Sequence, residues 1–275
     1  MLSRVAEMLN ASVWTYGFAF AFVTAVELML PRERHSLTGR LRGAGFWAVW
    51  VAFNAVVTTG YHALWAYFGV QPLVILPLRF EWAGAAAMLL APIAGAAAYD
   101  FFFYWFHRAQ HRWLWRFHAV HHSVRELNGI NTYHHITEPL FQTMFLLIPV
   151  SLILADTGQA VAAMTVAIYL HSLFIHSSTR LHLGPLRALI VDNRFHRIHH
   201  SLEERHFDRN FGAFTTIWDR MFGTAHFPAH AEWPATGLAQ VDEPRTFRQW
   251  ADLPWRIDRP EAAPVHSASA AANAI

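Results

Sequence analysis

Cysteine is absent from this sequence of 275 residues, and lysine is absent too, since all 21 basic residues are arginine. Without cysteine the chain has no disulfide, no thiolate zinc site, no iron–sulfur cluster and no haem held by a thiolate. Any metal ion must therefore be bound by imidazole and carboxylate groups.

Charge is also scarce, at 15% of residues against 54% that are hydrophobic. That balance favours a membrane protein over an average soluble enzyme. The formal net charge is only +2, and no basic run is interleaved with aromatic residues, so no nucleic acid partner is expected. There is no Gly-x-Gly-x-x-Gly nucleotide fingerprint and no His-Glu-x-x-His protease helix.

Apolar residues gather in five segments, which cover residues 12–30, 44–68, 82–106, 140–155 and 159–175. The first three are long enough to cross a bilayer core of about 30 Å. A cleaved signal peptide is the alternative for the first, but its long apolar run lacks a clear cleavage site, which favours a retained helix. The last two are short, and Pro149 interrupts one of them. They could form a tight transmembrane hairpin or a re-entrant pair.

Arginine predicts the orientation of these segments. The loop with Arg32, Arg34, Arg40 and Arg42 lies on the same side as residues 107–125, whereas the other side has few arginines. Positive loops face the cytoplasm. The predicted fold is all-α: an integral-membrane helical bundle of three long helices plus a short hairpin, with a cytoplasmic histidine-rich di-metal cap. One domain would cover 1–259, with the cap at 107–139 and 177–259 and a disordered tail at 260–275. In a bacterium, this would be the inner membrane.

Nineteen histidines are present, and eight of them form compact boxes. The boxes read His-x-x-x-His and twice His-x-x-His-His; their members are His107, His111, His118, His121, His122, His196, His199 and His200. Imidazoles three and four residues apart share one face of a helix. A straight helix would separate the two ends of the 107–122 stretch by about 22 Å, so we expect a turn within 112–116.

Eight imidazoles exceed the three or four ligands of one zinc ion, so the boxes predict two metal ions. Imidazole suits iron, zinc, copper and nickel alike, and ligand type alone does not name the metal. Isolated histidines such as His35, His62 and His226 are expected to be structural. A divalent-metal transporter is the alternative from another class, but it would carry its ligands at mid-depth in the membrane, whereas these boxes flank the apolar segments.

The motifs between about residues 100 and 223 resemble the fatty acid hydroxylase/sterol desaturase superfamily of integral-membrane non-haem di-iron oxygenases. They include DFFFYWFHRAQH, RFHAVHHS, RFHRIHHS and HFDRNFGAFTTIWDRMFGT. The resemblance implies that the eight box histidines bind two iron ions. It adds His176 as a ninth ligand, because His176 stands where the family has the histidine of a His-Ser-Asn motif. Ser178 replaces the asparagine of that motif.

The resemblance also implies residues that support the ligands. His135 and Glu138 fit a family motif that Tyr133 and Ile136 do not, and His134 is a weaker candidate than His135. His182 has no clear counterpart. A ligating imidazole needs its other ring nitrogen bound to a carboxylate or carbonyl group. The supporting residues predicted for this and related roles are Asp100, His135, Glu138, Asp208, Asn210 and Asp219.

The predicted function is therefore an O2-dependent di-iron hydroxylase or desaturase that acts on a C–H bond of a membrane lipid, such as a sterol or a fatty acyl chain. Cleavage of an ether lipid by the same site is an alternative. Because the chain lacks cysteine and a nucleotide motif, electrons must come from a separate ferredoxin, cytochrome or reductase. The oligomeric state is left open.

Overall fold

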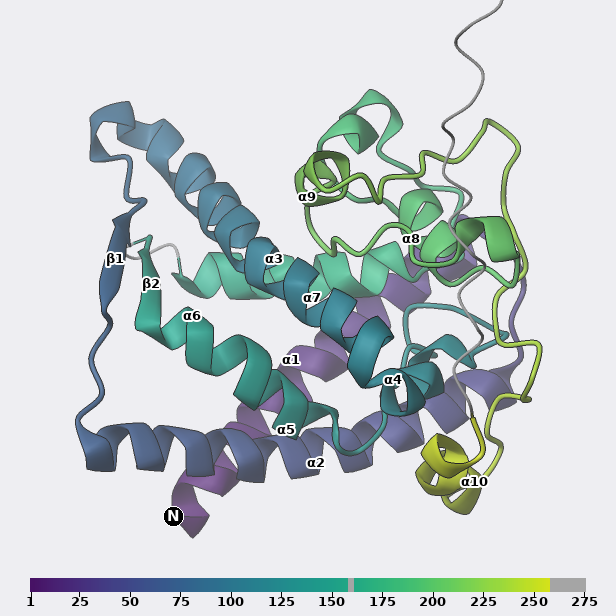
Figure 1. Cartoon of the computed structure of the whole chain (residues 1–275), viewed down its shortest axis with the longest axis horizontal. Coiled ribbons are helices and arrows are strands. Elements are labelled where there is room, and N and C mark those ends of the chain that lie inside the picture. Colours follow the sequence, from purple (N-terminus) through teal and green to yellow (C-terminus); the bar gives the residue numbers. More distant parts are fainter. Residues whose placement is uncertain (158–160, 258–275) are drawn as a thin grey trace, which may run out of the picture.

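The computed structural model describes residues 1–157 and 161–257. Three long helices dominate it: α1 (Leu2–Met29), α2 (Leu37–Phe68) and α3 (Ala87–Trp113), which follows the 3-10 turn η1 (Glu81–Ala86). By length and composition, α1, α2 and the η1–α3 segment could each cross a membrane. Figure 1 shows α2 along one edge of the molecule, with α1 crossing behind it and α3 running diagonally above. The predicted set of three long membrane helices is confirmed.

The start of α2 differs from the prediction, because the helix begins at Leu37 and not at residue 44. Ser36 caps its first turn by accepting a hydrogen bond of 2.9 Å from the Gly39 amide. Arg40 and Arg42, which the sequence placed in a loop, lie in the first turns of this helix. Ion pairs with Glu27 and Glu243 hold them there.

The region 138–175 is more broken than a simple helical hairpin. It consists of α5 (Glu138–Gln142), a π-helical turn η2 (Thr143–Leu147), α6 (Ile148–Leu152), strand β2 (Ile153–Asp156) and α7 (Val161–Ile175). Pro149 lacks the amide that an α-helix would use to bond the carbonyl of residue 145, which accounts for the wider π turn just before it. The apolar helices here fall short of the 18 residues taken to span a membrane.

Strand β2 pairs in parallel with β1 (Val74–Pro77), with Val74 opposite Ile153. The sequence placed residues 153–155 in an apolar segment of an all-α fold, so this expectation of helix is corrected. Apolar runs of four residues do not distinguish strand from helix, and the partner strand lies 79 residues away. The pair lies at the opposite end of the molecule from α8 and α10 (Figure 1).

The cap contains short helices joined by turns and loops. They are α4 (Trp115–His122), η4 (Gly184–Ala188), α8 (Asn193–His199), η5 (Glu204–His206), α9 (Ile217–Met221), α10 (Phe247–Asp252) and η6 (Leu253–Trp255). The predicted tail at 260–275 lies outside the described residues, as do positions 159 and 160 of the fifth apolar segment.

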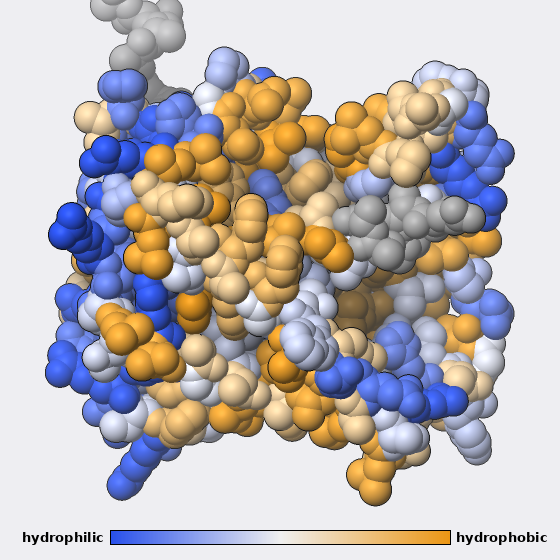
Figure 2. All heavy atoms as spheres, turned by 180° about the vertical axis from the view of Figure 1, so that it is seen from behind, coloured by the Kyte–Doolittle hydropathy of each residue, from blue (hydrophilic) through white to orange (hydrophobic). Residues whose placement is uncertain are grey.

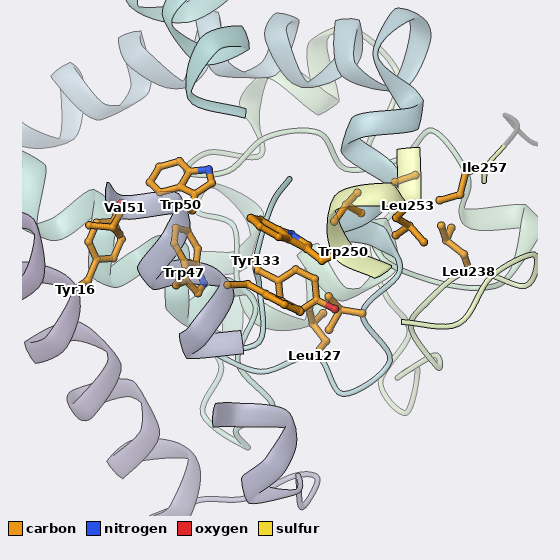
Figure 3. Close-up of a cluster of buried hydrophobic side chains, with 14 residues drawn as sticks. Tyr16, Trp47, Trp50, Val51, Leu127, Tyr133, Leu238, Trp250, Leu253 and Ile257 are labelled. Atoms are coloured by element: carbon orange, nitrogen blue, oxygen red, sulfur yellow. The ribbon is translucent and has the colours of Figure 1, made fainter. Parts of the chain in front are cut away.

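An aromatic core joins the cap to the membrane helices (Figure 3). Phe46 of α2 stacks on Trp250 of α10 at 5.1 Å and lies edge-on to Tyr133 at 4.8 Å. Trp47 and Tyr16 extend the same cluster toward α1. Aromatic side chains of this size dominate the energetics of a core. Helix α2 therefore packs against both the cap, through Phe46, and the membrane helix α1, through Trp47.

Large apolar side chains are exposed on α1, α2 and α3, among them Trp14, Phe18, Tyr67 and Met88. Figure 2 shows hydrophobic side chains across the middle of one face, with hydrophilic ones gathered toward both sides. An apolar belt between polar ends is what a bilayer requires. The long apolar helices and this belt together indicate an integral membrane protein.

Glu27, near the end of α1, is the main polar link between this helix and the cap. Its side chain is buried, and its Oε1 accepts hydrogen bonds from the Gly129 amide at 2.9 Å and the Ser178 amide at 3.0 Å. Arg40 donates to the other oxygen at 2.6 Å. A carboxylate at this depth would be costly if unpaired, so these contacts tie α1 firmly to two cap loops.

Candidate metal centre

The nine histidines predicted as ligands lie together in two buried groups. Within each group, one ligand atom of every member lies within 4.8 Å of those of the others. Group one contains His107, His111, His118, His122 and His199, and group two contains His121, His176, His196 and His200. The helix breaks inside the predicted range, since α3 ends at Trp113 and α4 begins at Trp115. This break folds the second box back onto the first.

In group one, the Nε2 atoms of the imidazoles converge. Nε2 of His118 lies 3.0 Å from that of His107 and 3.2 Å from that of His122, and Nε2 of His111 lies 3.2 Å from that of His122. His199, from α8, adds a buried Nε2 that has no hydrogen-bond partner. Helices α3, α4 and α8 therefore direct five ring nitrogens at one region.

Group two repeats this arrangement with ligands from other elements. Nε2 of His176, which follows α7, lies 3.2 Å from that of His121 and 3.0 Å from that of His196. Both ring nitrogens of His200 are buried without a partner. The two groups are neighbours, because the rings of His122 and His200 stack at 4.6 Å.

The outward-facing nitrogens show how the rings are held. In both groups Nδ1 atoms donate to backbone carbonyls: His107 to Phe211 at 2.7 Å, His121 to Thr132 at 3.1 Å, His176 to Ser172 at 2.6 Å and His199 to Arg209 at 2.8 Å. A carbonyl can only accept, so each Nδ1 carries the hydrogen. In the neutral ring, Nε2 is then left with a free lone pair directed into the group.

In this tautomer the Nε2 atoms within a group cannot hydrogen-bond to one another. Burial lowers the pKa of His121 well below its ordinary value and that of His176 to about 4, so both rings are neutral near pH 7. Their Nε2 lone pairs then face each other across 3.2 Å with no hydrogen between them. A bound metal ion would turn this repulsion into coordination. The residues present thus fit a pair of metal ions.

Asp100, in α3, does not bond to a histidine in the structure. Its carboxylate accepts hydrogen bonds from three successive amides, of Ala213, Phe214 and Thr215, at 2.8 to 2.9 Å, and from the Thr215 hydroxyl at 3.2 Å. In place of the expected contact with a ligand, Asp100 thus holds the loop 211–215 by hydrogen bonds to its backbone. That loop carries the Phe211 carbonyl, to which His107 donates.

Asp219 and Asn210 hold the same loop from its other side. The Asp219 carboxylate accepts from the Phe211 and Gly212 amides, both at 2.8 Å. Burial raises the pKa of Asp219, and these hydrogen bonds oppose the rise. Asn210, with a positive φ of 59°, bonds the Phe195 carbonyl at 2.7 Å and so links the loop to α8. All three residues position the ligands through the backbone.

Asp208 is the predicted supporting residue that contacts a ligand directly. Its Oδ1 lies 3.2 Å from Nδ1 of His111, and its side chain is 47% exposed while that of His111 is 9% exposed. Asp208 therefore differs from the other Nδ1 partners of the ligand imidazoles described above, which are backbone carbonyls. A carboxylate behind a ligating imidazole raises its basicity.

The structure reverses the expected order of His134 and His135. His135 lies outside both groups, where its ring nitrogens contact Thr137 and the Ala251 carbonyl. The His134 ring instead stacks on His121 at 4.0 Å, and it forms a further small group with His118 and Glu138. Sequence reasoning ranked His134 below His135 because His135 is the histidine that fits the family motif.

Glu138 is buried at the start of α5 and accepts a hydrogen bond of 2.7 Å from Gln110 of α3. Its Oε2 has no partner and belongs to the small group with His118. His206, His226 and Glu232 form another group that sequence reasoning missed. Both ring nitrogens of His206 already have partners, Ser201 at 2.8 Å and Glu232 of the same group at 3.1 Å.

Comparison with known proteins agrees with this centre. The fatty acid hydroxylase family model matches residues 92–224, which include all nine histidines. Human alkylglycerol monooxygenase is 28% identical over 68% of this chain and 39% of its own length. Ornithine lipid hydroxylase OlsE from Rhizobium tropici is 33% identical over 58% of this chain and 48% of its own.

A more distant relative, very-long-chain aldehyde decarbonylase GL1-6 from Oryza sativa, is 26% identical over 52% of this chain and 24% of its own length. The chain thus matches less than half the length of each of these curated relatives. No solved structure matches it.

Proposed function

Because residues 92–224 place this chain in the fatty acid hydroxylase/sterol desaturase superfamily, we propose that it is a di-iron enzyme that uses O2 to oxidise a C–H bond of a membrane lipid. The observation that carries the proposal is the pair of buried imidazole groups with converging, neutral Nε2 atoms. Group one would bind one iron ion and group two the other. The bound ions would supply the oxidising chemistry by activating O2 with electrons from outside the chain.

The residues of the chain have three tasks in this proposal. The carbonyl partners orient the imidazoles, and Asp100, Asp219 and Asn210 hold the loop that supplies one of those carbonyls. Burial of every ligand histidine excludes water from the centre. The apolar helices would border the path of a lipid substrate, since α3, which carries His107 and His111, belongs to a segment long and apolar enough to cross a membrane.

Hydroxylation and desaturation are both open to such a site, and the relatives support a lipid as the substrate. A second candidate is cleavage of an ether lipid by oxidation of the carbon beside the oxygen. The similarity to human alkylglycerol monooxygenase, which covers 68% of this chain, supports ether cleavage as this second candidate.

For either activity, the electron donor would be a separate ferredoxin, cytochrome or reductase. The arginines between residues 32 and 42, at the junction of α1 and α2, support a cytoplasmic position for the centre.

The test is metal analysis of the purified full chain together with O2 uptake. About two iron ions per chain and O2 consumption that depends on reductant and lipid would support the oxygenase. Lipid mass spectrometry of cells with and without the protein should then show products shifted by one oxygen or two hydrogens. Metal flux in liposomes without any O2 chemistry would refute it in favour of a transporter.

A further inference from the structure

A cavity with several charged side chains in its walls lies in the cap, separate from the histidine groups. It has a volume of about 550 Å³, and its walls include Glu33, Arg34, His35, Arg125, Arg197 and Thr236. The first three belong to the loop between α1 and α2. Arg197 belongs to α8, where it lies between His196 and His199 along the chain, and its guanidinium donates to Glu33.

The charge of this cavity is predominantly positive. Three guanidinium groups face one carboxylate, and that carboxylate is already used: Glu33 accepts hydrogen bonds from Arg197 at 2.9 Å and from the Trp233 indole at 2.8 Å. Arg34 is exposed and has no ion pair among the described residues. Arg125 pairs with Asp242, but their side chains are 46% and 81% exposed, and such a surface pair contributes little.

His35 provides an independent sign of a ligand. Its side chain is only 5% exposed, yet Nε2 has no hydrogen-bond partner. The nearest carboxylate oxygen, Oε2 of Glu33, is 3.8 Å away, which is too far for a hydrogen bond. A buried polar nitrogen without a partner is costly, and one that lines a cavity can be satisfied by a bound molecule.

We propose that this cavity binds a phosphate-class anion, held by the guanidinium groups of Arg34 and Arg125 and by the ring of His35. Planar guanidinium groups bind phosphate oxygens with two parallel hydrogen bonds. The loop 30–36 joins two membrane helices, so the cavity lies near the level of lipid headgroups. The ligand is accordingly a phospholipid headgroup or free phosphate. This site does not depend on the oxygenase activity proposed above.

Occupation of the cavity would also affect the metal centre through α8. Arg197 and Leu202 line the cavity, and His196, His199 and His200 lie between or beside them in the chain. An anion that fixes Arg34 against this wall therefore stabilises the helix that supplies ligands to both groups. Ligands that bind only the folded state raise its stability by mass action.

The test uses the full metal-loaded chain and two probes. Inorganic phosphate is titrated by calorimetry in detergent, and binding of phosphatidylglycerol is counted by native mass spectrometry from nanodiscs that also contain phosphatidylcholine. We expect the double variant Arg34→Gln/Arg125→Gln to weaken binding of the anion at least tenfold. Arg248→Gln, which removes an exposed arginine in α10, is the matched control and should leave binding unchanged.

Each outcome is decisive. Loss of phosphate binding in the double variant supports a site open to free phosphate, whereas loss of phosphatidylglycerol binding alone supports a headgroup site. Failure of both probes to bind the unmodified chain overturns the proposal, and so does equal binding by the double variant and the control. Unchanged iron content in the variants shows that they fold.

Discussion

The two histidine groups consist of the same residue type but differ in their surroundings. Group one has five imidazoles, and one of them, His111, faces the half-exposed carboxylate of Asp208. Group two has four, and the described Nδ1 partners of its members are backbone carbonyls. If each group binds one ion, as proposed above, the carboxylate behind His111 predicts unequal basicity of the ligands at the two positions. Substitutions that affect one group and spare the other test whether the ions are also unequal.

The largest effect is expected from two neighbouring ligands that belong to different groups. His122→Ala should remove a ligand from group one, and His121→Ala should remove one from group two. Each variant should bind about one iron ion fewer per chain and lose O2-dependent turnover, because a missing ligand leaves an incomplete shell. Metal content by mass spectrometry and O2 uptake measure both effects.

His182→Ala is the control for this pair, since His182 is an exposed histidine outside the groups. It should keep full iron content and activity. If His121→Ala or His122→Ala behaved like the unmodified chain, the assignment of the corresponding group would be wrong.

A smaller effect is expected from Asp100→Asn, which acts on group one through the loop 211–215. The amide presents one acceptor oxygen where the carboxylate presents two, so at least one buried backbone amide loses its partner. The expected loss of stability is about 3 kcal/mol. The midpoint of thermal unfolding in detergent measures it, and His107 should be the ligand most disturbed, since it donates to the Phe211 carbonyl.

Asp156→Asn serves as the matched comparison, because Asp156 accepts from Arg79 in an exposed pair at the far end of the molecule. Its cost should stay below about 1 kcal/mol. Equal losses in the two variants would contradict the special role of the loop.

The smallest effect is expected from Asp208→Asn, which keeps the shape of the side chain but removes its charge. Loss of a carboxylate behind a ligand typically lowers metal affinity by about 10–100-fold. The loss should appear in one of the two ions only, the one in group one. Stepwise removal of iron by a chelator separates the two, and a parallel loss of both would mean that the groups do not act independently.

The long helices and the histidines of the two buried groups could be singled out from sequence because their signals are local. Apolar length marks α1 to α3, and box spacing marks the histidines. His176 needed the family resemblance, since nothing in its own neighbourhood marks a lone histidine as a ligand. The partners of the imidazoles were beyond reach because most are backbone carbonyls, such as that of Phe211, and a carbonyl has no sequence signature.

The errors also have physical causes. Pairing of β1 with β2 depends on register between distant segments, which short apolar runs do not encode. Asp100 was predicted to support a ligand histidine, but the partner of its carboxylate in the structure is a stretch of backbone about 113 residues later. Long-range hydrogen bonds of this kind become visible only once the chain is folded.

The position of Glu27 has a consequence for how the protein is made. This carboxylate lies in α1, and two of its partners, the amides of Gly129 and Ser178, are synthesised 102 and 151 residues after it. Arg40 can neutralise it in the meantime. Final docking of α1 must therefore wait until the loops after the second histidine box and after α7 have emerged. Helix α1, which resembles a simple membrane anchor, can thus reach its final position only together with the folding of the cap loops.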